Sequence, residues 1–120
     1  MKKKLLIPLY KNDVAPRFDL VTEVVIATLE ETGENSIEKM IVLPQASSEQ
    51  LCNLILTEGI EAVICGGIEQ EYYEYLTWKK VLVFDSVIGP YSAAIEYFKK
   101  GKLHSGSILY GKYIRVQNVE

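Results

Sequence analysis

Short β-branched runs and helix-like stripes alternate along this chain, with glycine or polar clusters between them. The apolar runs predict five strands, at residues 5–10, 24–29, 37 with 40–43, 62–65 and 81–84. Apolar residues spaced by three and four predict three helices, from Ser47 to Gly59, from Glu69 to Leu76 and from Pro90 to Gly101. The predicted order is strand, strand, strand, helix, strand, helix, strand, helix.

Local signals mark the ends of these segments. Ser47 and Gln50 have the spacing of a capping box, and Gly59 favours the left-handed conformation that ends a helix. Pro90 suits the first position of the last helix. The second and third strands are joined by few residues and are expected to pair antiparallel, whereas the later strands alternate with helices. The chain is therefore predicted to be an α/β protein, a three-layer α/β/α sandwich around a mixed five-stranded sheet.

Composition places the chain among single-domain globular proteins. It has 120 residues, of which 48% are hydrophobic and 24% charged, and this length is enough for one core. The net charge of −3 gives no basic excess, so nucleic acid is not an expected partner. The apolar run that follows the lysines at the start ends at Pro8 and is too short for a signal or a membrane segment. We therefore expect a cytoplasmic protein with no membrane contact.

Two segments are candidates for binding an anion. Gly66 and Gly67 follow the fourth predicted strand, at residues 62–65, and precede a helix. Backbone amides at such a place can face a ligand; the alternative is a tight turn. Neither a dinucleotide-binding nor a P-loop spacing is present. Arg17 and Asp19 lie in the first loop, on either side of Phe18. Arg17 is predicted either to bind an anion at two points or to form a surface pair with Asp19.

Metal and nucleophile chemistry receive little support from the residue pattern. Cys52 and Cys65 are weak candidates for soft-metal ligands, and the alternative is that both are small buried hydrophobes. His104 is the only histidine in the chain, which argues against a catalytic zinc and against a histidine-activated nucleophile. The residue pattern therefore supports neither a catalytic metal site nor a nucleophile activated by a neighbouring base.

Aromatic residues gather in the second predicted helix. Tyr72, Tyr73, Tyr75 and Trp78 cannot all face the sheet. The exposed members are predicted to form a surface for a homodimer or another partner, and the alternative is ordinary core packing.

Four segments together resemble the dinitrogenase iron–molybdenum cofactor biosynthesis family, which includes NifX-like domains and NifB C-terminal-like domains. The segments are Ile7-Pro8, Val14-Ala15-Pro16-Arg17-Phe18-Asp19, Gly59 to Ile68, and the ending with Gly89, Ala94 and Phe98 to Leu103. The resemblance implies a ribonuclease H-like fold. It also implies that the protein binds or carries an iron–sulfur cluster or an iron–molybdenum cofactor precursor without catalysis.

The resemblance also places the site and the domain. The family loop often reads Ser-x-His-Phe-Gly, and its positions match residues 15–19, so Arg17 stands where the histidine would be. The implied binding residues are Arg17, Phe18, Asp19, Gly66 and Gly67, and Arg17 is expected to meet an anionic cluster or acid through its charge. The resemblance covers about residues 4–103. It divides the chain into a NifX-like domain, 1–103, and a C-terminal extension, 104–120, in which 113–116 is a candidate strand.

Three functions remain open at this point. The leading hypothesis is a non-enzymatic binding or carrier protein that holds an anionic ligand or a metal–sulfur cluster between the first loop and the Gly66-Gly67 turn. The second is a structural or regulatory interaction protein without a cluster, for which the aromatic residues of the second helix are the surface. The third is a nuclease, which the fold name alone suggests and for which Asp85 is the candidate acid.

Overall fold

The computed structural model describes residues 3–30 and 36–110. Its elements are β1 (Lys3–Tyr10), β2 (Asp13–Val14), the 3-10 helix η1 (Phe18–Leu20), β3 (Glu23–Leu29), β4 (Ser36–Val42), α1 (Ser48–Thr57), β5 (Ala62–Ile64), α2 (Gln70–Trp78), β6 (Leu82–Phe84) and α3 (Tyr91–Lys99). None of the described helices is long and apolar enough to cross a bilayer.

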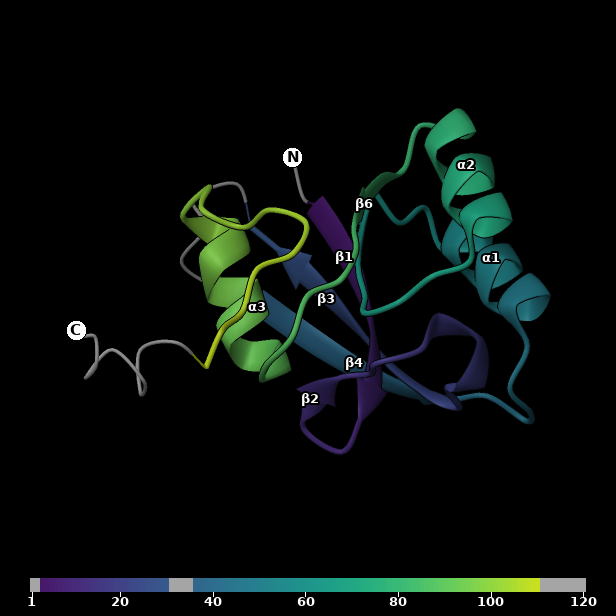
Figure 1. Cartoon of the computed structure of the whole chain (residues 1–120), viewed down its shortest axis with the longest axis horizontal. Helices are drawn as coiled ribbons and strands as arrows, with labels where there is room; N and C mark the ends of the chain where they lie inside the picture. Colours follow the sequence, from purple (N-terminus) through teal and green to yellow (C-terminus); the bar gives the residue numbers. More distant parts are fainter. Residues whose placement is uncertain (1–2, 31–35, 111–120) are drawn as a thin grey trace.

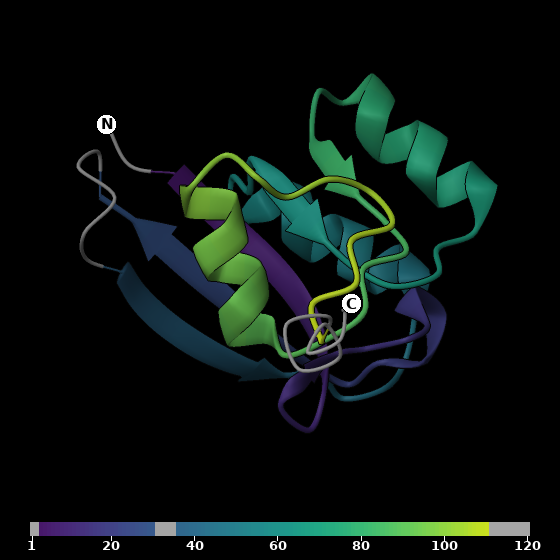
Figure 2. The ribbon, with the colours of Figure 1, turned by 60° about the vertical axis from the view of Figure 1, so that its left-hand side comes forward.

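One mixed sheet lies between two layers of helices. Its strand order is β4-β3-β1-β5-β6, and β2 pairs with β1 beside this path. Strand β3 is antiparallel to both β1 and β4, whereas β5 and β6 run parallel to β1. Helix α3 covers one face of the sheet, and α1 and α2 cover the other (Figures 1 and 2). The predicted three-layer α/β/α sandwich with a mixed sheet is confirmed. The predicted five strands are a correction, because the sheet of the described residues has six, the sixth being β2 beside β1.

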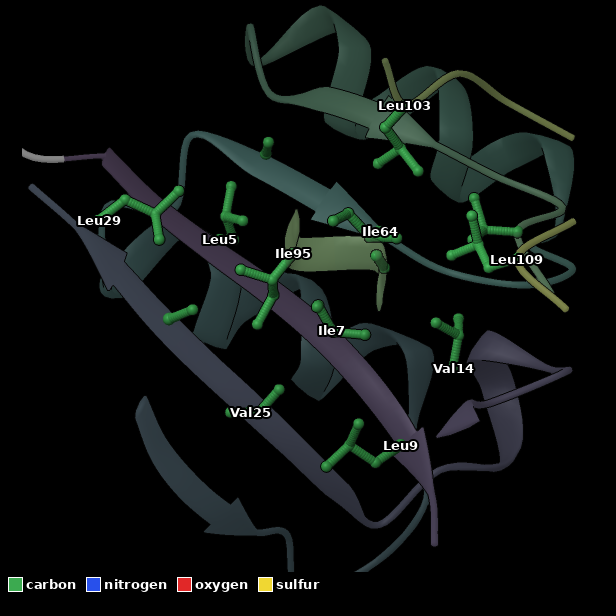
Figure 3. Packing of buried hydrophobic residues seen from close by; sticks show 14 residues of the cluster. Leu5, Ile7, Leu9, Val14, Val25, Leu29, Ile64, Ile95, Leu103 and Leu109 are labelled. Carbon is green, nitrogen blue, oxygen red and sulfur yellow. The ribbon is translucent and has the colours of Figure 1, made fainter. Parts of the chain in front are cut away.

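The central strand β1 supplies both cores. Successive side chains of a strand point to opposite faces. Leu5, Ile7 and Leu9 therefore pack on the α3 side with Ile95 (Figure 3), whereas Leu6 packs on the side of α1 and α2. A strand that is covered on both faces reads as an unbroken apolar run rather than an alternating one.

The signals that mark the ends of α1 are confirmed, whereas the start of α3 differs from the prediction by one residue. Ser47 caps α1 and its side-chain oxygen accepts a hydrogen bond from the Gln50 N–H at 3.1 Å. Gly59 adopts a φ of +67°, as expected for the end of that helix. Pro90 is not the first residue of α3 but its extended N-cap, with ψ 141°. The reason is that Pro90 forms a β-bridge with Asp13, which holds its backbone extended.

The first loop that the sequence predicts, residues 11–19, is not irregular throughout. It contains the two-residue strand β2 and leads into η1. Two residues of strand are too short to leave a periodic pattern.

Residues 103–110 fold back onto the α3 side of the sheet (Figure 2). Leu103 and Leu109 are buried there, and Ile108 bridges Ile88. The boundary at residue 103 stays a prediction, and the candidate strand 113–116 lies outside the described residues.

Candidate functional site

The first loop is held against the end of β1 by backbone hydrogen bonds. Pro8 has no N–H for the sheet, but its carbonyl accepts the N–H of Ala15 at 2.9 Å. The N–H of Val14 donates to the Gly89 carbonyl at 2.9 Å. The turn between β1 and β2 places Lys11 at a φ of +58°. These bonds fix the course of the loop before it reaches Arg17.

The loop then lies directly on the Gly66-Gly67 turn. The Gly67 N–H donates to the Pro16 carbonyl at 2.7 Å, and the Phe18 N–H donates to the Gly67 carbonyl at 2.8 Å. A Cβ on Gly66 would stand 2.4 Å from the Ala15 carbonyl oxygen. The glycines therefore serve a close approach of two backbone segments. The N–H of Gly67 is bonded to the loop and does not face a ligand.

Arg17 forms a two-point pair with Asp19. Its Nε donates to Asp19 Oδ1 at 3.0 Å, and its terminal nitrogen donates to Oδ2 at 2.7 Å. The hydrogen bond from Arg17 holds the pKa of Asp19 below its usual value, and the same contact raises the pKa of Arg17. The Arg17 side chain is 63% exposed, so solvent screens the pair and its contribution to stability is small. The guanidinium can exchange this partner for an anion from solution.

Arg17 also lines a hollow of about 580 Å³ at the end of β1, which we call the basic hollow. Its apolar lining includes Leu9, Tyr10, Pro16, Leu20 and Val21. Lys11 lines it as well, with Nζ 5.4 Å from the centre of the Tyr10 ring. Glu23 contributes the one carboxylate to the lining. Two cations beside an apolar surface fit a ligand that carries both an anionic group and an apolar body.

Sequence reasoning did not select Lys11, Tyr10 or Leu20. The available signal was the position of Lys11 at the carboxyl end of the central strand, which is where open α/β sheets bind their ligands. Leu20 is 61% exposed, whereas the hydrophobic pattern predicts that a leucine is buried.

The two glycines line a different hollow of about 430 Å³, which we call the glycine hollow. It lies beyond the carboxyl ends of the parallel strands, and Pro16 and Tyr10 line both hollows. Asp13 and Tyr110 line it too, and the hydrogen bond to Asp13 raises the pKa of Tyr110. The described residues put no lysine or arginine in this lining. The positive charge therefore lies on the Arg17 side.

The two cysteines do not suit metal binding. Cys52 and Cys65 are both buried, and burial raises the pKa of their thiols to about 11 and about 12. A metal ligand must be the thiolate, which these surroundings disfavour. Among residues 3–30 and 36–110, no group of three or more histidine, cysteine or carboxylate side chains is placed to hold a metal ion. The exposed His104 has its Nδ1 3.0 Å from the Ser105 carbonyl oxygen.

The aromatic residues of α2 divide between core and surface. Tyr72 packs against the core under α1 and α2. Tyr73 and Tyr75 are each 37% exposed, and Trp78 is 73% exposed. The Lys79 ammonium lies 4.9 Å from the Trp78 ring and 5.8 Å from the Tyr75 ring. Part of the predicted cluster is therefore available as a surface.

Comparison with known proteins shows the fold. The structure resembles PH0822, with a TM-score of 0.74 and 26% identity over 85% of this chain and 95% of that one. It resembles a provisionally assigned dinitrogenase of Methanocaldococcus jannaschii, MJ0327, with a TM-score of 0.69 and 21% identity over 86% and 93% of the two chains. A third structure is a provisionally assigned NifB protein of Thermotoga, TM1290, placed in the DUF35 family, with a TM-score of 0.65 and 20% identity over 86% and 92%.

The chain shares the fold of these proteins. No protein-family model matches the sequence, and no curated protein matches it. The likeness therefore lies in the arrangement of strands and helices, and the NifX-like assignment remains a resemblance.

Proposed function

We propose that this protein is a non-enzymatic binding protein that holds a small anionic ligand with an apolar body in the basic hollow. The observation that carries the proposal is the joint presence of Arg17 and Lys11 in the lining of a hollow of about 580 Å³ with largely apolar walls. Arg17 supplies a planar, two-point donor, and Lys11 supplies a second positive charge. The apolar walls take the rest of the ligand.

The proposal matches a carrier or accessory role of the kind that the nitrogenase cofactor family implies, and two structures with the same fold carry dinitrogenase and NifB descriptions. The residues present do not fit direct ligation of an iron–sulfur cluster or iron–molybdenum cofactor precursor, because both thiols are buried with raised pKa values. The ligand that we propose is therefore recognised by charge and apolar contact, through Arg17 and Lys11.

Calorimetric titration with naphthalene-2-sulfonate tests the proposal, and the uncharged naphthalene-2-sulfonamide is the matched ligand. The sulfonate is expected to bind and the sulfonamide to bind more weakly. A charge-assisted hydrogen bond contributes about 1.5–3 kcal/mol, and exposure reduces this, so Arg17→Ala is expected to weaken binding by about ten-fold. Asp19→Asn is expected to strengthen binding, because it removes the competing carboxylate.

Lys102→Ala is the control, since Lys102 is exposed and lies outside the basic hollow. Absence of sulfonate binding, or equal binding by the wild type and Arg17→Ala, would refute the proposal. Equal losses in Arg17→Ala and Lys102→Ala would show that only the net charge matters.

The second candidate is an interaction protein, and the exposure of Trp78 favours it. The surface of Tyr73, Tyr75 and Trp78 is proposed to contact a partner, a second copy included. Light scattering on the wild type, Tyr73→Ser and Trp78→Ser tests this proposal. A mass that is the same in all three proteins counts against it.

A further inference from the structure

Strand β4 forms one edge of the sheet, and no described strand pairs with its outer side (Figure 2). It is seven residues long, whereas β6 at the other edge has three. Three of its apolar side chains are largely exposed, namely Ile37 at 63%, Met40 at 58% and Val42 at 72%. A long edge strand with exposed apolar residues is a template for pairing with another chain.

The register between β3 and β4 shows which backbone groups of β4 are not hydrogen-bonded to β3. The N–H of Leu43 donates to the Thr22 carbonyl at 2.7 Å, so this pair is hydrogen-bonded. Bonded and non-bonded pairs alternate along an antiparallel ladder. Val42, Met40 and Glu38 therefore stand in the non-bonded pairs of the β3–β4 ladder, and their N–H and C=O groups point outward.

Strand β4 has few of the features that protect edge strands. Its pairing with β3 is continuous from Ser36 to Val42, without a bulge. It contains no proline, and Lys39 is its one lysine. Protected edges are usually short, twisted by bulges, or broken by proline and charge. The outward backbone groups of Met40 and Val42 thus remain available for pairing.

We propose that β4 pairs antiparallel with β4 of a second copy, across a two-fold axis at Met40. A two-fold axis perpendicular to the sheet keeps each side chain on its own face, so paired residues must lie on the same face. The axis can therefore lie only where one residue of β4 stands opposite the same residue of the second copy. An axis at Glu38 or at Lys39 sets like charges opposite each other, which destabilises a sheet. An axis at Ile41 leaves only two bonded pairs within the strand, whereas an axis at Met40 gives three. An axis at Met40 sets it against Met40 of the partner subunit.

The same register sets no like charges opposite each other among the outward residues. Val42 lies opposite Glu38 of the partner subunit, and the reciprocal pair follows from the symmetry. These outward groups form about six hydrogen bonds across the axis, two for each bonded pair. Glu38 is already oriented toward the α3 side, where it accepts a hydrogen bond from the Tyr91 hydroxyl at 3.1 Å. The two sheets then join into one continuous sheet.

Sedimentation equilibrium over a range of protein concentrations tests this interface. The wild type is expected to approach twice the chain mass of 13.6 kDa. Met40→Lys sets two charges across the axis and is expected to weaken association by at least about ten-fold, because like charges directly opposite are destabilising. Met40→Glu is expected to behave similarly, and an equimolar mixture of the two variants is expected to restore a dimer.

Two further variants separate this interface from loss of folding and from other surfaces. Met40→Pro removes an outward N–H without touching a bond to β3, so circular dichroism is expected to stay native while the dimer is lost. Leu82→Lys changes an apolar residue that is 58% exposed at the opposite edge, and it is expected to leave the dimer intact.

Several results would overturn the proposal. These are a monomeric wild type at all concentrations, a dimeric Met40→Lys protein, or dissociation caused by Leu82→Lys. A monomeric wild type that dimerises when the chain ends at Tyr110 would assign the edge to residues 111–120 instead. Anion binding at the basic hollow does not enter any of these readouts.

Discussion

Replacing Gly66 by alanine tests whether the first loop owes its position to a close approach at the end of β5. The new Cβ would lie 2.4 Å from the Ala15 carbonyl oxygen and 2.8 Å from both Cα and the carbonyl oxygen of Pro16. All three contacts are backbone atoms, so the loop itself must move. Extra atoms in a tightly packed site cost about 1–3 kcal/mol, which corresponds to a fall in Tm of about 5–15 °C for a domain of this size.

Gly67→Ala is the matched control. Its Cβ would lie 3.2 Å from the Pro16 carbonyl oxygen, its one neighbour within 4 Å, and this contact needs only a small shift. Alanine also restricts the unfolded chain, which stabilises by about 0.4–1 kcal/mol. Urea unfolding is therefore expected to show a clear loss for Gly66→Ala and almost none for Gly67→Ala. Equal stability of Gly66→Ala and the wild type would refute the proposed close approach.

Three further predictions concern single groups. Ser47→Ala is expected to destabilise by about 1 kcal/mol through loss of the α1 cap. Ser48→Ala is expected to stabilise, because the buried Ser48 hydroxyl has no hydrogen-bond partner among the described residues; the urea midpoints of the two variants compare them. Burial raises the pKa of Cys65 from 9.0 to about 12, so the unfolded state loses its proton first and stability should fall as pH rises above about 9. Unfolding from pH 7 to pH 11 should show a smaller fall for Cys65→Ala, and an unchanged fall would contradict the assignment. In Arg17→Ala the pKa of Asp19 should rise toward its ordinary 3.8, as read by carboxyl NMR titration; an unchanged value would show that Arg17 is not its partner in solution.

The sheet and its helices were accessible from the sequence because their signals are local and agree with one another. Ser47 with Gln50 marks the start of α1, and Gly59 marks its end. The apolar run at 5–9 belongs to a strand buried on both faces, which is what an unbroken run predicts. Strand β2 left no such signal, because its pairing with β1 depends on the turn rather than on periodicity.

The geometry of the site was less accessible. Gly66 and Gly67 are compatible with amides that face an anion and equally with a close backbone approach, since both need the absence of a side chain. The fold decides between them, because the Gly67 N–H donates to the Pro16 carbonyl. The sequence marks Arg17 as a cation of the first loop, but its hollow depends on residues from β1 that come together only in the folded chain. Binding by Arg17, Phe18, Asp19 and the two glycines stays a prediction.

The most direct test of the account is an ¹⁵N chemical-shift titration of the folded protein with naphthalene-2-sulfonate. We predict that the largest amide shifts fall within residues 9–23, around the basic hollow, and that they disappear in Arg17→Ala. Shifts confined to α2, or an unperturbed spectrum at millimolar ligand, would contradict the claim that this hollow binds anions.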